Sequence, residues 1–134
     1  MQNLNTLLKK VEKLKLLYIE DNEDVRQSTV GLFGNIFHDI TVAEDGEEAL
    51  EKLESSSYGY DLVITDINMP KVDGYEVIEQ IRKTDSNIKI YILSAYNQVD
   101  NIQKAGSRVD AYLYKPLNMK MLFDVLEQHY GEGS

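Results

Sequence analysis

The sequence predicts an α/β fold in which a doubly wound parallel sheet is covered by helices on both faces. Three observations lead to this prediction. Short continuous apolar runs, which are typical of strands buried on both faces, recur along the 134 residues. Segments with apolar residues at helical spacing separate these runs, so that five strands alternate with five helices. The connections are short, which suits right-handed crossovers and leaves no linker that would split the chain.

The first half of the chain accounts for three of the strands. Leu14 and the run 16–19 form the first continuous apolar stretch, which predicts a strand. Apolar residues at helical spacing, from Val25 to Ile36 and Phe37, then predict a helix. The remaining elements of this half are a strand at residues 40–43, a helix around residues 49–53 and a third buried strand at residues 62–64.

The second half continues the same alternation. Val77, Ile78 and Ile81 are at helical spacing and indicate a helix after the third strand. The segments that follow are, in order, a strand at residues 88–93, a short helix at residues 99–105, a strand at residues 111–114 and a last helix at residues 122–129. Each strand therefore has a helix after it, as a parallel sheet requires.

We expect one domain at residues 14–130, with a short addition at each end. Residues 1–13 form an N-terminal extension that we expect to be helical and to pack on the domain, because its leucines and Val11 are at helical spacing. A dimer contact and a linker from a longer protein are the alternatives for this segment. Residues 131–134 are expected to be a disordered tail or a remnant of expression. The chain ends about where the last helix should, so it is either a stand-alone domain or part of a longer protein.

The composition excludes several classes of protein. The chain has 14 Lys and Arg against 23 Asp and Glu, and its net charge of −9 argues against direct nucleic-acid binding. It has no cysteine, which excludes disulfide scaffolds, zinc fingers and a thiol nucleophile. The sequence has no apolar run near the ~18 residues of a membrane span and no signal peptide. We therefore expect a soluble, cytoplasmic protein that does not insert into a membrane.

Polar side chains follow four of the expected strands. Glu20 and Asp21 come directly after the first strand, and Asp66 closes the third. Ser94 follows the fourth strand and Lys115 follows the fifth. Because ligands of open α/β sheets bind beyond the carboxyl ends of the strands, these side chains are expected to converge at one edge.

A cluster of carboxylates at one edge needs a cation. Two carboxylates 4 Å apart repel by about 4 kcal/mol at an effective dielectric constant of 20. A hard divalent ion with oxygen ligands, Mg²⁺ in particular, fits a set with few protein oxygens. Such a cluster beside Lys115 suits a phosphoryl group, and a carboxylate can act as the nucleophile. Read singly, Asp66 is more often a turn or capping residue and Lys115 a surface lysine; the arrangement as a whole favours a site.

Two stretches carry a resemblance to a known family. One is the run from Asp61 to Glu76, DLVITDINMPKVDGYE, and the other is Tyr114-Lys115-Pro116. Together they resemble the response-regulator receiver domain, the CheY-like module of two-component signalling, over residues 16–130. The resemblance implies a flavodoxin-like (CheY-like) fold with three α/β/α layers and a five-stranded parallel sheet in the order 2-1-3-4-5.

The resemblance also implies a phosphorylation site that uses Mg²⁺. Asp66 matches the phosphoacceptor of the family. Asp21 matches a direct metal ligand, and Glu20 matches the neighbour that usually reaches the metal through water. Asn68 would supply its backbone carbonyl to the metal. Glu20 stands where aspartate is commoner in the family, so its extra methylene is expected to shift the water shell of the metal.

Further roles are implied near the other strand ends. Ser94 matches the hydroxyl that bonds a phosphoryl oxygen, and Lys115 matches the lysine that pairs with the phosphoryl group. Tyr112 matches the aromatic switch residue that turns inward when the hydroxyl moves. A cis peptide bond between Lys115 and Pro116 is expected by the same resemblance. We also expect Tyr96 to shield the phosphoryl group from water.

The implied function is that of a signalling receiver, which catalyses only its own phosphorylation and dephosphorylation. Its partners would be a sensor histidine kinase or a histidine phosphotransfer protein, and a downstream effector or output domain that reads the face of the fourth helix, fifth strand and fifth helix. The receiver would be a monomer or a phosphorylation-dependent dimer.

Three alternatives stay open at this point. A haloacid-dehalogenase-like phosphatase would need a second aspartate where Asn68 stands. A flavodoxin-like FMN binder would need a glycine- and hydroxyl-rich phosphate loop, whereas residues 20–24 are mostly acidic. A receiver that is not phosphorylated would act only as a protein-binding module.

Overall fold

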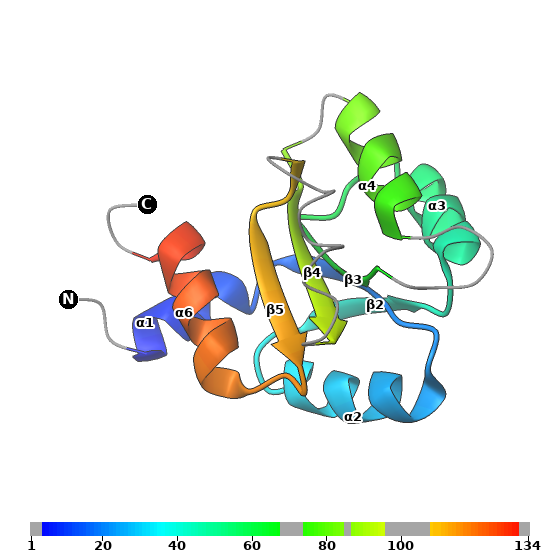
Figure 1. The fold of residues 1–134 in the computed structure, drawn as a ribbon. Coiled ribbons are helices and arrows are strands. Elements are labelled where there is room, and N and C mark those ends of the chain that lie inside the picture. Colours follow the sequence, from blue (N-terminus) through cyan, green and yellow to red (C-terminus); the bar gives the residue numbers. More distant parts are fainter. Residues whose placement is uncertain (1–3, 68–73, 85–86, 96–107, 132–134) are drawn as a thin grey trace.

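A five-stranded parallel sheet lies at the centre of the computed structural model, which describes residues 4–67, 74–84, 87–95 and 108–131 (Figure 1). Its strands are β1 (Lys15–Ile19), β2 (Asp39–Ala43), β3 (Leu62–Asp66), β4 (Lys89–Ala95) and β5 (Ala111–Lys115). They are arranged in the order β2-β1-β3-β4-β5, and every neighbouring pair is parallel. This is the 2-1-3-4-5 order of a flavodoxin-like fold, which confirms the predicted fold class.

Helices cover both faces of the sheet. Those in the described residues are α1 (Leu4–Val11), α2 (Glu23–Phe33), α3 (Gly46–Ser55), α4 (Gly74–Lys83) and α6 (Met119–Tyr130). Helices α3 and α4 pack on one face, and α1, α2 and α6 pack on the other, which gives the three layers (Figure 1). Within the described ranges, none of the helices has the length and apolar character that crossing a membrane requires.

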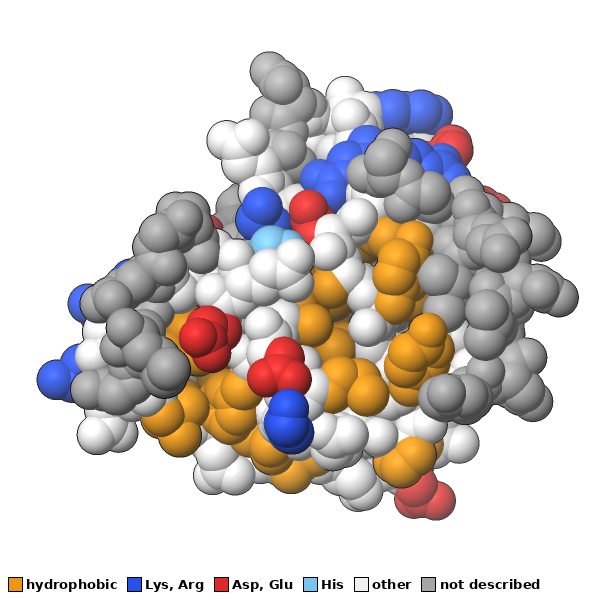
Figure 2. Space-filling view, turned by 60° about the vertical axis from the view of Figure 1, so that its left-hand side comes forward, with side chains coloured by type: hydrophobic (Ala, Val, Ile, Leu, Met, Phe, Trp, Pro, Cys, Tyr) orange, Lys and Arg blue, Asp and Glu red, His pale blue; other side chains and the backbone are white. Residues whose placement is uncertain are grey.

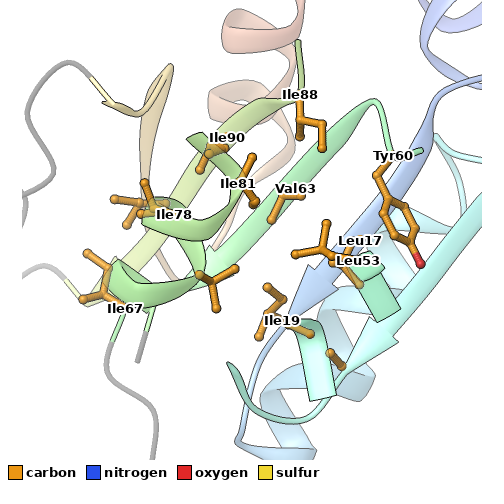
Figure 3. Packing of buried hydrophobic residues seen from close by; sticks show 14 residues of the cluster. Leu17, Ile19, Leu53, Tyr60, Val63, Ile67, Ile78, Ile81, Ile88 and Ile90 are labelled. Carbon is orange, nitrogen blue, oxygen red and sulfur yellow. The ribbon is translucent and has the colours of Figure 1, made fainter. Parts of the chain in front are cut away.

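Alternate residues of each strand contribute to two separate cores. Leu17 and Val63 face α3 and α4, as the close view of that cluster shows (Figure 3). Leu16, Tyr18 and Ile64 face the opposite layer of α1, α2 and α6. Both sets are fully buried, which explains why the strands read as continuous apolar runs. The same alternation decides toward which face a polar side chain at a strand end points.

Helix α1 adds to the second core. Its Leu7 and Val11 are buried in the same cluster as Leu126 of α6, and α1 lies beside α6 in Figure 1. Lys9 and Lys10 are exposed. The extra N-terminal helix thus packs on the domain by the apolar stripe that its sequence spacing predicts.

Three helices have an N-cap residue whose side chain accepts a backbone hydrogen bond. Asn22 accepts from Val25 N at the start of α2. Asp45 accepts from Glu48 N at the start of α3, and Asn118 accepts from Met121 N at the start of α6. Each of these residues lies in the short loop after a strand, so the caps fix where the chain leaves the carboxyl end of the sheet.

Some of the predicted boundaries are wrong. Helix α2 ends at Phe33, with Gly34 as its C-cap, so Ile36 and Phe37 lie beyond the helix although both are buried. Both lie in a tight turn in which their N–H groups donate to Phe33 O, and this turn keeps their side chains on the apolar side. The third strand extends to Asp66 and the fourth to Ala95, so both Asp66 and Ser94 belong to strands.

The predictions for Asn68, Tyr96, the helix at residues 99–105 and residues 132–134 lie outside the described residues. They therefore stay predictions.

Candidate functional site

Three carboxylates meet where β1 and β3 end. Glu20 directly follows β1, Asp21 is the next residue, and Asp66 is the last residue of β3. Ile19 pairs with Thr65 in the β1–β3 register, which places Glu20 beside Asp66. Carboxylate oxygens of all three side chains lie within 4.8 Å of one another. Glu20 and Asp66 are buried and Asp21 is exposed, so the cluster opens to solvent at Asp21.

Lys115 joins this cluster from the far edge of the sheet. Its Nζ lies 2.7 Å from Glu20 Oε1 and donates a hydrogen bond of 3.0 Å to Asp66 Oδ2. Lys115 is the last residue of β5, and the peptide bond that follows it, to Pro116, is cis. The strand alternation explains the contact, because Glu20, Asp66 and Lys115 all continue the series of side chains that points toward α2 and α6.

Burial and charge work against each other in this cluster. Burial raises the pKa of Glu20 from its ordinary value of 4.5 to about 7; the Lys115 ammonium opposes the rise and the Asp66 carboxylate adds to it. Burial alone would lower the pKa of Lys115, but its contacts with Glu20 and Asp66 outweigh burial and raise it. The lysine therefore stays charged, and it contacts two of the three acids.

The donor set fits a hard divalent cation. Oxygen ligands within a few ångströms of one another, with one of the carboxylates open to solvent, are what Mg²⁺ uses in proteins. The cluster also carries three acids for one contacting lysine, so an added cation would offset repulsion that Lys115 leaves in place. Glu20, Asp21 and Asp66 are the side chains among the described residues that could hold such an ion.

The structure places Ser94 and Tyr112 on the other face of the sheet. Ser94 is fully buried, and its residue position follows Leu93, the register partner of Asp66. Tyr112 is half-buried and packs against the core of α3 and α4. Both residues therefore lie near the strand ends that carry the acids, but on the opposite face of the sheet from α2. This is the face that α3 and α4 cover.

Two residues near the site were missed by the sequence reasoning. Arg26 of α2 donates from Nη1 to the backbone oxygen of Glu20 at 3.0 Å. Gly74 begins α4 so close to β3 that an added Cβ would lie 2.5 Å from the backbone oxygen of Asp66 and 2.9 Å from Ile67 Cα. A glycine inside the recognised run signals such a close approach, whereas an arginine in a helix carries no comparable signal.

Comparisons with known sequences agree on one family. The sequence model of the response regulator receiver domain matches residues 16–127. Chemotaxis protein CheY of Treponema pallidum (strain Nichols) is 32% identical over 114 residues, which are 82% of this chain and 78% of that protein. Sensor protein EvgS of Escherichia coli (strain K12) is 34% identical over 122 residues, 90% of this chain. The chain spans only 10% of the length of EvgS.

Solved structures give the same result. The receiver domain of Francisella response regulator 1452 is 32% identical with a TM-score of 0.71, covering 87% of this chain and 98% of that one. A response regulator receiver domain protein from Clostridium thermocellum has a TM-score of 0.77 at 26% identity, covering 87% and 93%. The phosphatase and flavin-binder alternatives are not favoured by these matches. An acidic cluster that fits Mg²⁺, in a sheet of this strand order and with these relatives, shows that the chain belongs to the family of response regulator receiver domains.

Proposed function

We propose that this receiver accepts a phosphoryl group on Asp66 and thereby switches the surface that a partner reads. The observation that carries the proposal is the contact of Lys115 Nζ with Asp66 Oδ2 inside the cluster of Glu20, Asp21 and Asp66. Asp66 is the buried acid that both contacts the lysine and ends a strand, so an incoming phosphoryl group would meet a nucleophile and a cation together.

The transfer itself needs a donor, which we propose is the phosphohistidine of a sensor histidine kinase or of a histidine phosphotransfer protein. An oxygen of the Asp66 carboxylate attacks phosphorus, a P–O bond forms, and the P–N bond of the donor breaks. The imidazole leaves with the electron pair. Glu20, Asp21, Asp66 and the backbone carbonyl of Asn68 would hold Mg²⁺ during this step. When bound, Mg²⁺ supplies positive charge that offsets the charge of the phosphoryl group and the acids.

The remaining site residues would convert the transfer into a signal. Phosphorylation adds about −1.5 to −2 charges and three acceptor oxygens at Asp66. Lys115 is close enough to pair with that charge, and the Ser94 hydroxyl would donate to it. Movement of Ser94 would free space for Tyr112 to turn inward, and the face formed by residues 99–105, β5 and α6 would change. A partner senses the change only if it prefers one of the two arrangements.

Relatives of this chain indicate the kinds of partner to expect. EvgS is a sensor protein, and the relative from Guillardia theta, 38% identical over 111 residues, is a probable transcriptional regulator. We propose that residues 14–130 act as the receiver and residues 1–13 as its extension, with residues 131–134 as a tail. The protein would work in the cytoplasm, as a monomer or as a dimer that forms on phosphorylation.

The test is labelling of the purified chain by acetyl phosphate. In the presence of Mg²⁺ we expect one phosphoryl group per chain, detected in the mass of the intact protein. Asp66→Asn abolishes this labelling because it removes the nucleophile, and EDTA abolishes it in the unaltered chain. Asp124→Asn, which changes an exposed acid on α6, is the matched control and keeps the labelling. Labelling that persists in the Asp66 variant would refute the assignment of the acceptor.

A further inference from the structure

We propose that Arg26 is a positioning residue that holds the backbone between Glu20 and Asp21 in place and so raises the affinity of the acidic cluster for a divalent cation. The inference rests on the proposed function, because it assigns a role within that same site. It starts from the hydrogen bond of 3.0 Å that Arg26 Nη1 donates to the backbone oxygen of Glu20. The bond reaches the chain at the point where β1 gives way to the loop that leads to α2.

Glu20 is held on both sides by its backbone. Its N–H donates to Ala43 O at 3.1 Å, which continues the pairing of β1 with β2 by one residue. Its carbonyl, which is the first half of the peptide unit to Asp21, is the group that accepts from Arg26. Fixing these two groups fixes the two peptide units that flank the Glu20 Cα. The direction in which the Glu20 side chain leaves the backbone follows from these two planes, and the second plane also fixes where the Asp21 Cα lies.

The guanidinium is itself anchored from two elements. The backbone N–H of Arg26 donates to Asn22 O at 2.8 Å in the first turn of α2. Its Nη2 lies 3.3 Å from Oε1 of Glu44, a residue just after β2. The Arg26 side chain is 13% exposed, whereas that of Glu44 is 65% exposed. A planar fork with several donors can hold a carbonyl and a carboxylate together, which one ammonium on a flexible stem does less well.

Arg26 and Lys115 therefore act on the cluster in different ways. Lys115 contacts carboxylate oxygens that a metal ion would use as ligands. Arg26 contacts the backbone oxygen of Glu20 and the carboxylate of Glu44, which leaves the carboxylates of the cluster available. A cation that binds the cluster competes with Lys115 for oxygens, while Arg26 keeps its contacts. Residues that orient metal ligands in this way commonly contribute about 10–100-fold to metal affinity.

The experiment is a calorimetric Mg²⁺ titration of the unphosphorylated chain and of two variants. Arg26→Met removes every donor and keeps much of the apolar stem, and we expect its Mg²⁺ affinity to fall by about tenfold. Arg26→Lys keeps the charge but not the fork, and we expect a smaller loss in the same direction. If only the charge of Arg26 mattered, Arg26→Lys would keep the Mg²⁺ affinity of the unaltered chain. Arg26→Met would then bind Mg²⁺ more tightly, because it removes a positive charge near the cation. That pattern, or affinities within twofold of the unaltered chain in both variants, would overturn the inference.

One control variant separates positioning from general stability. Arg82→Met removes an arginine that likewise bonds backbone oxygens and a carboxylate, but at the opposite end of the sheet. We expect this variant to lose stability and to keep its Mg²⁺ affinity. The proposed function is tested separately, by Mg²⁺ binding and Asp66 labelling of the unaltered chain. If the unaltered chain binds Mg²⁺ and is labelled but the Arg26 variants bind Mg²⁺ equally well, only the inference about Arg26 fails.

Discussion

The two ends of the sheet each hold a cluster of charged side chains, and the two clusters are built in opposite ways. At the carboxyl end, three acids crowd around Lys115. At the amino end, Arg82 of α4 and Asp110, just before β5, form the centre of a cluster in which the described charges are matched with partners. The same fold therefore carries one cluster with an excess of acids and one, here called balanced, in which each charged side chain has a partner of opposite sign.

The amino-end cluster ties three segments together. Arg82 donates to Arg108 O and to Ile88 O, each at 2.8 Å, and to Asp110 Oδ2 at 3.1 Å. Asp110 also accepts from Ile90 N, and Arg108 forms an ion pair with Glu79. Basic side chains gather at this end of the molecule in the space-filling view (Figure 2). Their contacts reach the start of β4 and the chain before β5, so the cluster fixes where these strands enter the sheet.

The carboxyl-end cluster differs in its effect on stability, because burying its carboxylates destabilises the folded state. The buried carboxyl of Glu20 has a pKa raised to about 7, and burial is the largest cause. Buried groups with strongly shifted pKa values are typical of functional sites, whereas a balanced cluster is typical of contacts that stabilise the fold. The comparison predicts that changes at the amino end alter stability without altering cation binding, and that changes at the carboxyl end do both.

The largest expected effect is the loss of stability in Arg82→Met. The substitution leaves two backbone oxygens without this donor and removes the closest cationic partner of Asp110. We expect the free energy of unfolding to fall by about 3 kcal/mol, as measured by urea denaturation. Lys120→Met is the matched control, because its pair with Asp124 is exposed and is worth at most about 0.5 kcal/mol. A loss in Arg82→Met no larger than in the control would remove the distinction between the two ends.

An effect of intermediate size is expected from the pH dependence of stability at Glu20, measured in EDTA. The folded chain holds the Glu20 proton up to a pH of about 7, whereas the unfolded chain releases it near 4.5. Between these values the folded state binds more protons, so its stability falls as the pH rises and levels off above about 7. The total is at most on the order of 3 kcal/mol.

Glu20→Gln serves to isolate that contribution. The amide cannot ionise, so the variant lacks this decline, and at pH 8 it is more stable than the unaltered chain. Parallel stability profiles of the two proteins between pH 4.5 and 7 would show that burial does not strain the carboxyl. The carboxyl end would then be balanced like the amino end.

The sequence is enough to predict the fold class and the proximity of three side chains, and both predictions have the same physical basis. Parallel strands bring their carboxyl ends to one edge, so the positions of Glu20, Asp66 and Lys115 directly after or at the ends of apolar runs are enough to place them together. The strand order required the resemblance, because the apolar runs alone are compatible with several orders. The functional roles of these residues remain predictions that the labelling and binding experiments test.

Contacts between elements could not be predicted in the same way. Arg26 follows the N-cap Asn22 by one helical turn, and nothing in the sequence distinguishes it from a solvated arginine until α2 is placed against the end of β1. The pair of Arg82 with Asp110 joins residues from different elements and depends on how α4 lies over β4. The predicted end of α2 is wrong because the turn beyond the helix keeps Ile36 buried on the apolar side. A continued helix would have placed Ile36 on the same side, so the apolar spacing cannot distinguish the two structures.

The smallest expected effect tests the amino end with a stabilising change. Ser57 lies between α3 and β3 with a φ of 56°, a left-handed conformation that favours glycine. There the N–H of Tyr58 donates to Leu53 O at 2.7 Å and closes the helix. We expect Ser57→Gly to raise the free energy of unfolding by roughly 0.5–1 kcal/mol in urea denaturation, because it relieves the backbone strain.

The control for this change is Ser55→Gly, the same substitution two residues earlier. Ser55 is the last residue of α3 and its hydroxyl donates to Glu51 O, so glycine there is expected to destabilise by a similar amount. Neither variant touches the acids at the far end of the sheet, so both should bind Mg²⁺ as the unaltered chain does. A change in Mg²⁺ affinity in Ser57→Gly would mean that the two ends are coupled through the sheet. The division between a balanced end that holds the fold and a charged end that binds a cation would then fail.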